Sequence, residues 1–251
     1  MAILKMNENT PLEFGLYSLG DHLLNPHNGE KVSYEQRIQE LIEASQLAEQ
    51  AGIDVFGVGE SHQEHFTTQA HTVVLGAIAQ ATNKIKISSS SSIISAADPV
   101  RIFEDFATLD LISHGRAEIV AGRASRTGLF DLFGLDLNNY DELYEEKLNL
   151  LLELNKTDKI TWSGKFRPDL NNMKIFPRPI DDEIPIWRAV GGPVASAIKA
   201  GRQGIPMMIT TLGGPAMTFK DSIDEYRLTA KEHGFDTSAQ SLPVSTASLF
   251  Y

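Results

Sequence analysis

Cysteine is absent from this chain of 251 residues. Its absence excludes disulfide bonds, thiolate catalysis and cysteine-ligated zinc or iron–sulfur sites, and it fits a reducing cytoplasm. Long hydrophobic runs are also missing, since none approaches the ~18 residues that a membrane-spanning helix needs. The apolar part of the N-terminal stretch MAILKMNENTPLEF is too short for a signal peptide. We therefore expect a soluble, cytoplasmic protein.

Positive charge is scarce. The chain has 22 lysines and arginines against 33 acidic residues, so its formal net charge is -11. Such an excess of negative charge disfavours phosphate backbones and anionic lipids, and we expect neither nucleic acid nor membrane as a partner. No G-x-G-x-x-G motif follows the first predicted strand, which argues against a dinucleotide-binding Rossmann domain.

Apolar runs of strand length alternate with segments of helical spacing. The predicted strands are residues 12–19, 53–58, 84–94, 116–122, 184–190, 205–210 and 242–250. Predicted helices include 70–82, 140–155, 193–203 and 215–233, and 160–179 form an excursion with a short hairpin. This alternation predicts a parallel sheet with right-handed crossovers. We expect one α/β domain over residues 1–251, a (β/α)8 TIM-type barrel without its last βα unit.

Capping residues mark the ends of two of the helices. Ser33 and Gln36 have the spacing of a capping box, and Gly52 suits a left-handed cap at the end of the same helix. Asp98 is placed as an N-cap, with Pro99 in the first helical turn.

The stretch GVGESHQEHF, residues 57–66, directly follows the second predicted strand. In a TIM-type barrel, chemistry takes place where strands end and the following loops begin. The two histidines and two glutamates suit a metal site, an organic active site or a solvated loop. His62 and His65 are three residues apart, whereas the zinc motif H-E-x-x-H places its histidines four apart. The residues alone leave these interpretations open.

A second candidate site follows the fifth predicted strand, where GGPVAS, residues 191–196, opens a helix. Gly191 and Gly192 allow close backbone approach, the free N–H groups of a helix start bind anions, and Ser196 adds a hydroxyl group. Arg123 stands on the same rim, just past the fourth strand. Together these residues predict a pocket for one phosphate group. The alternatives are an ordinary helix start and an arginine paired with a protein carboxylate.

Five consecutive serines, residues 88–92, lie between IKI and II. A serine run usually indicates a linker, but these apolar neighbours favour a strand. The hydroxyl groups would then form a polar floor for a heteroaromatic ligand, or a polar barrel interior with bound water.

Several ordered blocks resemble the bacterial luciferase-like, flavin-dependent monooxygenase family over about residues 12–233. They are EFGLYSLGDH, LAEQAGIDVFGVGESH, IAQATNKIKI, DPVRIFEDFATLDLISHGRAEIVAGR, YDELYEEKLNLLLEL and IPIWRAVGGPVASAIKAGRQGIPMM. The most specific block is DPVR-x-x-EDFATLD-x-x-S-x-GR. The resemblance implies a (β/α)8 barrel that binds reduced FMN or, in one branch of the family, the deazaflavin F420.

The same resemblance assigns residues to the cofactor. Arg123, Gly192 and Ser196, with Gly191 beside them, map to the phosphate. Ser90 and Ser91 map to a non-prolyl cis peptide bond next to the flavin ring. His62 lies in the pocket region, and we expect it to be the catalytic residue that donates or accepts a proton. The family's Glu-His-His motif reads Glu60-Ser61-His62 here, so a serine stands at the position of the luciferase's catalytic histidine.

The function implied is an FMN-dependent oxidoreductase, a monooxygenase that acts on a small organic substrate with O2 and takes reduced flavin from a separate reductase. Metal would then have no part. The alternatives are an F420-dependent dehydrogenase, a flavin-binding protein without turnover and a metal-dependent barrel hydrolase. Because the missing unit leaves two open strand edges, we also expect a longer natural gene product and a homo-oligomer.

Overall fold

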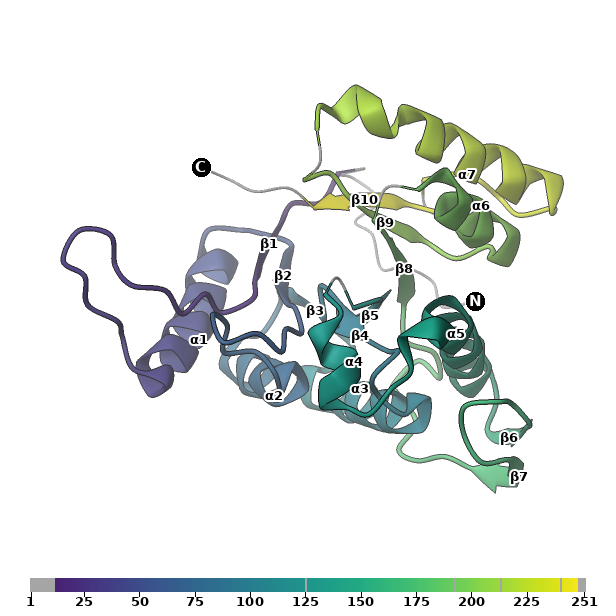
Figure 1. The fold of residues 1–251 in the computed structure, drawn as a ribbon, viewed down its shortest axis with the longest axis horizontal. Helices are drawn as coiled ribbons and strands as arrows, with labels where there is room; N and C mark the ends of the chain where they lie inside the picture. The colour runs from purple at the N-terminus through teal and green to yellow at the C-terminus, as the bar shows by residue number, and fades with distance from the viewer. Residues whose placement is uncertain (1–11, 125, 192, 213, 240, 248–251) are drawn as a thin grey trace.

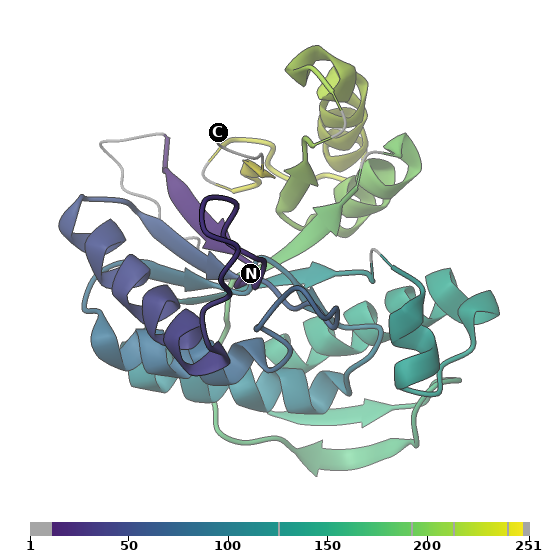
Figure 2. The ribbon, with the colours of Figure 1, turned by 60° about the vertical axis from the view of Figure 1, so that its left-hand side comes forward.

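The computed structural model describes residues 12–124, 126–191, 193–212, 214–239 and 241–247. Its main feature is a parallel sheet that curves into a half-barrel (Figures 1 and 2). The neighbouring strands, in order, are β1 (Gly15–Ser18), β2 (Val55–Val58), β3 (Lys86–Ser88), β5 (Ala117–Gly122), β8 (Ile186–Val190), β9 (Met207–Thr210) and β10 (Val244–Ala247). Every pair along this path is parallel. The predicted TIM-type arrangement without an eighth unit is confirmed as this half-barrel.

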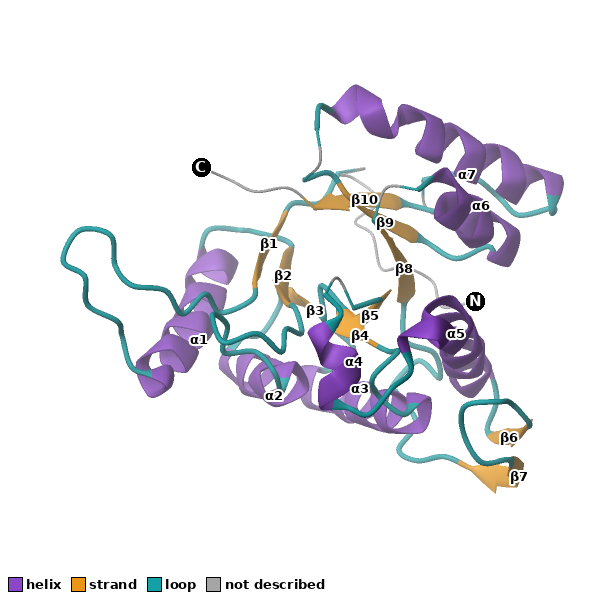
Figure 3. Ribbon diagram, viewed as in Figure 1, coloured by secondary structure: helices purple, strands orange, loops and turns teal. Residues whose placement is uncertain are grey.

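Helices cover the outer face of the sheet, as the colouring of Figure 3 makes clear. The longer ones are α1 (Tyr34–Gln50), α2 (His71–Ala81), α3 (Pro99–Ser113), α5 (Tyr140–Lys156), α6 (Val194–Gln203) and α7 (Lys220–Glu232). Shorter helical turns are α4 (Gly128–Leu132), η1 (Leu137–Asn139) and η2 (Ala216–Phe219). The predicted excursion is an antiparallel hairpin of β6 (Lys159–Trp162) and β7 (Leu170–Lys174).

The predicted caps are present. The Ser33 hydroxyl accepts a hydrogen bond from Gln36 N at 3.0 Å, and Gly52 has a φ of +80°. The Gln36 side chain donates to Glu40 at 3.0 Å, so only the hydrogen bond from Gln36 N to the Ser33 hydroxyl forms in this capping box. The Asp98 carboxylate accepts from Val100 N at 2.8 Å. These contacts satisfy N–H groups that the first turn of a helix otherwise leaves free.

The main core lies between the sheet and the helices outside it. Side chains alternate along each strand, so Phe56, Ile87 and Ile119 point outward and pack with Leu75 and Phe106 of the helices. The opposite face of the sheet carries a smaller cluster around Val120 and Trp187. Hydrophobic contacts between the sheet and the helices therefore stabilise the fold, and the polar groups described below lie at the ends of the strands.

One predicted element is corrected. The serine run does not continue a single strand over 84–94, because the ladder breaks after Ser88 and resumes in β4 (Ser92–Ile93), which pairs with β5. Between them the Ser89 hydroxyl accepts from Val120 N at 2.8 Å and so replaces a backbone partner in the ladder. A hydroxyl side chain that binds backbone in this way competes with regular strand pairing.

Candidate functional site

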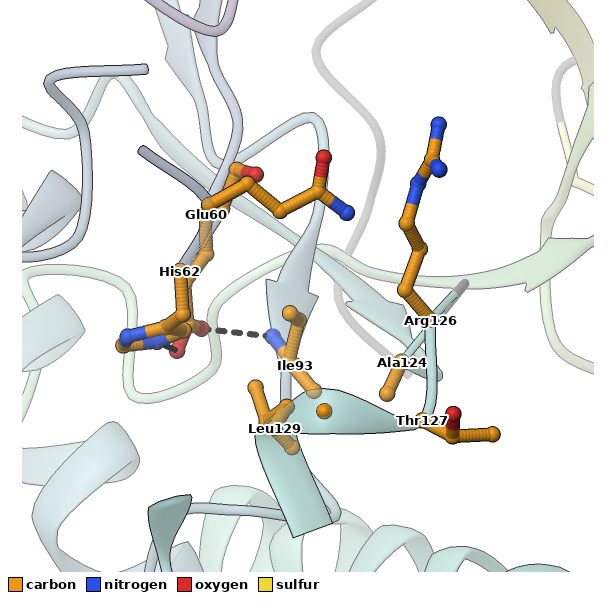
Figure 4. A pocket seen from close by; sticks show the side chains of 10 residues that line it. Glu60, His62, Ile93, Ala124, Arg126, Thr127 and Leu129 are labelled. Carbon is orange, nitrogen blue, oxygen red and sulfur yellow. Dashed lines mark hydrogen bonds and ion pairs between the residues drawn. The ribbon is translucent and has the colours of Figure 1, made fainter. Parts of the chain in front are cut away.

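A cavity of about 340 Å³ opens where β2, β4 and β5 end (Figure 4). Its lining residues are Glu60, Ser61, His62 and Gln63 after β2, Ile93 in β4, and Ala124, Arg126, Thr127, Gly128 and Leu129 after β5. Ile93, Ala124 and Leu129 give it an apolar wall. The loop after β2 supplies carboxylate, imidazole and hydroxyl groups. The stretch after β2, residues 59–66, is called the mouth loop below, and its first residues line this cavity at the carboxyl ends of the strands.

Glu60 is the most connected residue of this cavity. Its Oε1 lies 2.7 Å from His62 Nε2, and its Oε2 accepts from Ile93 N at 2.7 Å (Figure 4). Its backbone N–H donates to Ser91 O at 2.9 Å. Burial raises the pKa of the Glu60 carboxyl above its usual range, although the hydrogen bonds from His62 and Ile93 act in the opposite direction. Sequence reasoning weighed Glu60 as a metal ligand and missed this role as an anchor.

A second buried histidine lies behind Glu60. His71, the first residue of α2, has its Nε2 at 2.6 Å from Ser92 Oγ and its Nδ1 at 3.8 Å from Glu60 Oε2. Burial, and to a lesser degree the charge of His62, lowers the pKa of His71 to about 4, so its ring is neutral at pH 7. No sequence pattern indicated a role for His71 beyond its place at the start of the helix that follows the mouth loop.

Ser90 and Ser91 lie in a turn between β3 and β4, joined by the cis peptide bond that the resemblance implied. The turn is enclosed by two glycines on the neighbouring strands. A Cβ atom at Gly57 would lie 2.7 Å from Ser90 Cβ, and one at Gly122 would lie 2.7 Å from Ser91 Cβ. These strands therefore leave room for the turn only because both positions have no side chain.

Three cationic side chains converge on Glu145 of α5. Arg188, fully buried in β8, donates to its two carboxylate oxygens at 3.0 and 2.6 Å. Arg123 reaches it at 3.2 Å and Lys199 of α6 at 2.9 Å. Burial by itself raises the pKa of this carboxyl, but the hydrogen bonds from Arg188 and Lys199 outweigh it and lower the pKa to about 2. Both guanidinium groups also lie over the Tyr144 ring, at 4.3 and 5.1 Å from its centroid.

The predicted phosphate residues meet this cluster in part. Arg123 pairs with a carboxylate, as the alternative interpretation held. Ser196 is buried, and its Oγ has no hydrogen-bond partner among the described residues. Ser196 and Lys199 are three residues apart in α6 and therefore lie on one face of the helix. Gly191 is exposed, with no atom within 4 Å of a Cβ built on it, and Gly192 lies outside the described residues. The free Ser196 hydroxyl and the start of α6 are groups that fit a phosphate, and Arg123 and Lys199 would have to share their charge between it and Glu145.

In the part of the chain that the structure describes, no three histidine, aspartate or glutamate side chains are grouped so that they could hold a metal ion. None of the helices in the same part of the chain has both the length and the apolar character needed to span a membrane.

The cavity lies at the carboxyl ends of the parallel strands, which is the end at which closed TIM-type barrels place their active sites. The sequence profile of the luciferase-like monooxygenase family matches residues 13–249, and the chain belongs to that family. The family includes flavin-dependent monooxygenases and F420-dependent dehydrogenases.

Curated relatives share about a quarter of their residues with the chain. Protein y4wF of Sinorhizobium fredii is 28% identical over 91% of this chain and 63% of its own length. The F420-dependent glucose-6-phosphate dehydrogenase of Amycolatopsis mediterranei is 28% identical over 73% of this chain and 57% of its own length. The chain thus spans less than two thirds of the length of these relatives.

Solved structures share the fold at lower identity. Monooxygenase RslO1 from Streptomyces bottropensis superposes with a TM-score of 0.83 at 20% identity, over 94% of this chain and 70% of RslO1. The oxygenating constituent of 3,6-diketocamphane monooxygenase from Pseudomonas putida, solved with FMN, gives 0.78 at 17% identity, over 93% of this chain and 66% of that protein. At these identities the likeness concerns the fold alone.

Proposed function

We propose that the chain is the flavin-binding part of an FMN-dependent monooxygenase that acts on a small organic substrate with O2. The observation that carries the proposal is the buried Ser196 hydroxyl in the first turn of α6, which has no hydrogen-bond partner among the described residues. Lys199, three residues later in the same helix, shares the Glu145 carboxylate with Arg123. A buried hydroxyl without a partner costs about 1–3 kcal/mol, and a phosphate oxygen would satisfy it.

In this proposal the residues around Ser196 and Arg123 bind the cofactor's phosphate, and the residues of the cavity after β2 act on the substrate. Ser196, the start of α6 and Arg123 would hold the phosphate. The turn at Ser90 and Ser91, between β3 and β4, would pack against the flavin ring. Reduced FMN, when bound, would supply the two electrons with which one oxygen atom of O2 enters the substrate and the other leaves as water. The apolar wall of the cavity would exclude water, and His62 would donate or accept a proton at the substrate.

The cofactor experiment compares ligands that differ in the phosphate. FMN should bind more tightly than riboflavin, because only FMN engages the Ser196 region. Arg123→Ala should weaken FMN by about 10- to 150-fold, the cost of one charge-assisted hydrogen bond, and change riboflavin affinity little. Arg167→Ala, which removes a distant arginine that pairs with Asp98 at 3.2 Å, is the matched control. Equal affinity of the native chain for FMN and riboflavin would contradict the phosphate site.

The second candidate is an F420-dependent dehydrogenase that transfers a hydride, favoured by the 28% identity to the Amycolatopsis dehydrogenase. The mass and visible spectrum of the copurified cofactor separate the two. For the monooxygenase, reduced FMN and O2 should yield an oxygenated product from an organic co-substrate only when the chain is present. His62→Ala should then lower product formation at least about tenfold with unchanged FMN affinity. Unchanged turnover would reduce His62 to a structural residue.

Two partners belong to the same proposal. A separate flavin reductase would supply reduced FMN, and its addition with NADH should support turnover. A second copy of the chain would cover the outer face of β1, where Phe14 and Leu16 are 63% and 44% exposed. Sedimentation should therefore detect an oligomer, and a well-folded monomer of 27.6 kDa would contradict self-association.

A further inference from the structure

We infer that Glu60 is a positioning residue, whose carboxylate fixes the ring of His62 with the proton on Nε2 and leaves Nδ1 as the proton-accepting atom. The inference deepens the proposed function and rests on it for its catalytic meaning. The Ser92–His71–Glu60–His62 contacts, however, stand on the geometry alone.

The first step is that the orientation of the Glu60 carboxylate is fixed by two hydrogen bonds. Its backbone N–H is held by Ser91 O at 2.9 Å, and its Oε2 is held by Ile93 N at 2.7 Å. The two contacts lie on either side of Ser92 in the chain, so Glu60 is tied to β4 from both ends. Oε1 is therefore presented in one direction, toward the loop that carries His62.

The second step concerns which ring nitrogen of His62 carries the proton. Ile93 N can only donate, so Oε2 is an acceptor, and an ionised carboxylate offers Oε1 as a second acceptor. At 2.7 Å the His62 Nε2–H fills that place. No described residue forms a hydrogen bond with Nδ1, and the His62 ring packs against Phe133 in a T-shaped arrangement, with ring centroids 5.0 Å apart and an interplanar angle of 86°. A hydrogen bond at one imidazole nitrogen sets the tautomer and so the task of the other.

The third step is that no other charged group takes the place of His62 at Glu60. His71 of α2 is the second basic group that faces Glu60, but its Nδ1 is 3.8 Å from Oε2, outside hydrogen-bond range, and its Nε2 is engaged with Ser92 Oγ at 2.6 Å. The ring of His71 is neutral, as its lowered pKa of about 4 requires. Arg126 also lines the cavity, and in Figure 4 its side chain extends away from the apolar wall.

The same loop offers a matched control. Glu64 lies 3.2 Å from His65, but both side chains are exposed, at 84% and 54%. An exposed pair holds no fixed geometry and contributes little. Glu64→Gln removes a carboxylate from a glutamate–histidine pair of this loop without touching the Glu60 contacts.

The experiment is nitrogen-detected NMR of the histidine rings at a pH where they are neutral, with His62 assigned by the loss of its signal in His62→Gln. The native chain should show His62 as the Nε2–H tautomer. Glu60→Gln should shift it toward a mixture, because one amide oxygen cannot accept from both Ile93 N and His62 Nε2. Glu64→Gln should leave it unchanged. A native Nδ1–H tautomer, or a Glu60→Gln spectrum equal to the native one, would overturn the inference.

Two further measurements keep the outcomes distinct. FMN affinity of Glu60→Gln should stay within about threefold of the native value, while turnover falls about tenfold or more and its pH profile changes. If Glu60→Gln fails to fold, the native tautomer alone decides, since it needs no variant. If the native chain shows the Nε2–H tautomer but binds neither FMN nor F420, the positioning contact stands and the proposed function fails.

Discussion

Glutamine in place of Glu145 should destabilise the fold by about 3 kcal/mol. The variant leaves the buried Arg188 guanidinium without its counter-ion, because glutamine is neutral and keeps only one of the two oxygens that accept from Arg188. The hydrogen bonds from Arg188 and Lys199 lower the pKa of this carboxyl from 4.5, its ordinary value, to about 2, and each pKa unit corresponds to ~1.36 kcal/mol. The ~3–5 kcal/mol lost when one partner of a buried ion pair is removed agrees with this estimate.

The pH dependence gives the sign of the effect. Because the folded-state pKa of Glu145 lies below the unfolded value, its stabilisation is complete above about pH 4.5 and is lost as the pH falls toward about 2. In urea denaturation the native chain and Glu145→Gln should therefore differ by about 3 kcal/mol at neutral pH and converge in acid. Glu142→Gln on the same helix, which removes an exposed partner of Lys165, should change stability by less than about 0.5 kcal/mol. A Glu145→Gln variant as stable as the native chain, or a difference that does not shrink in acid, would refute the reasoning.

Three further predictions concern the frame of the site. Gly57→Ala should lower the free energy of unfolding, measured in urea, by at least ~1–3 kcal/mol, because its Cβ would lie 2.7 Å from Ser90 Cβ. The control Gly76→Ala has open space around it in α2 and should raise the same quantity by up to about 1 kcal/mol. Equal effects of the two substitutions would contradict the packing of the turn at Ser90 and Ser91. Arg116→Lys should lower the free energy of unfolding by about 2–3 kcal/mol, because the guanidinium donates to four backbone carbonyls and one hydroxyl, which an ammonium group cannot all reach. An unchanged free energy of unfolding would argue against this network. His71 should titrate near its lowered pKa of about 4. Because the unfolded chain then binds a proton that the folded chain does not, the native chain should lose stability as the pH falls from 6.5 to 4, and His71→Gln should lack this dependence. An NMR titration of His71 with a midpoint near 6.5 would contradict the prediction.

Much of the framework could be predicted from local patterns. The spacing of apolar residues gave the strands and helices, and Ser33 and Asp98 marked helix starts that the structure confirms. These signals are local, because a cap or an amphipathic period depends on residues within a few positions. The family could likewise be identified from ordered blocks, and its profile matches residues 13–249.

The candidate site was predictable in its place but not in its contacts. The mouth loop after β2 was identified from its position, yet the partner of His62 is Glu60, and Arg188 and His71 were not predicted at all. Arg188 lies within a strand whose sequence, IPIWRAV, reads as an apolar run with one charge. Nothing near it in sequence indicates that Glu145, 43 residues earlier, compensates its burial.

The sequence by itself determined the elements, their order and the rim on which polar residues gather, because backbone preferences and side-chain periodicity act over short distances. Only the tertiary structure decided which charges neutralise one another. Burial makes an unpaired charge costly, so a buried cation must meet its counter-ion wherever the chain brings one. Arg123 shows the difference, since its rim position follows from the end of β5 but its partner, Glu145, is supplied by α5 only when helix and sheet pack together.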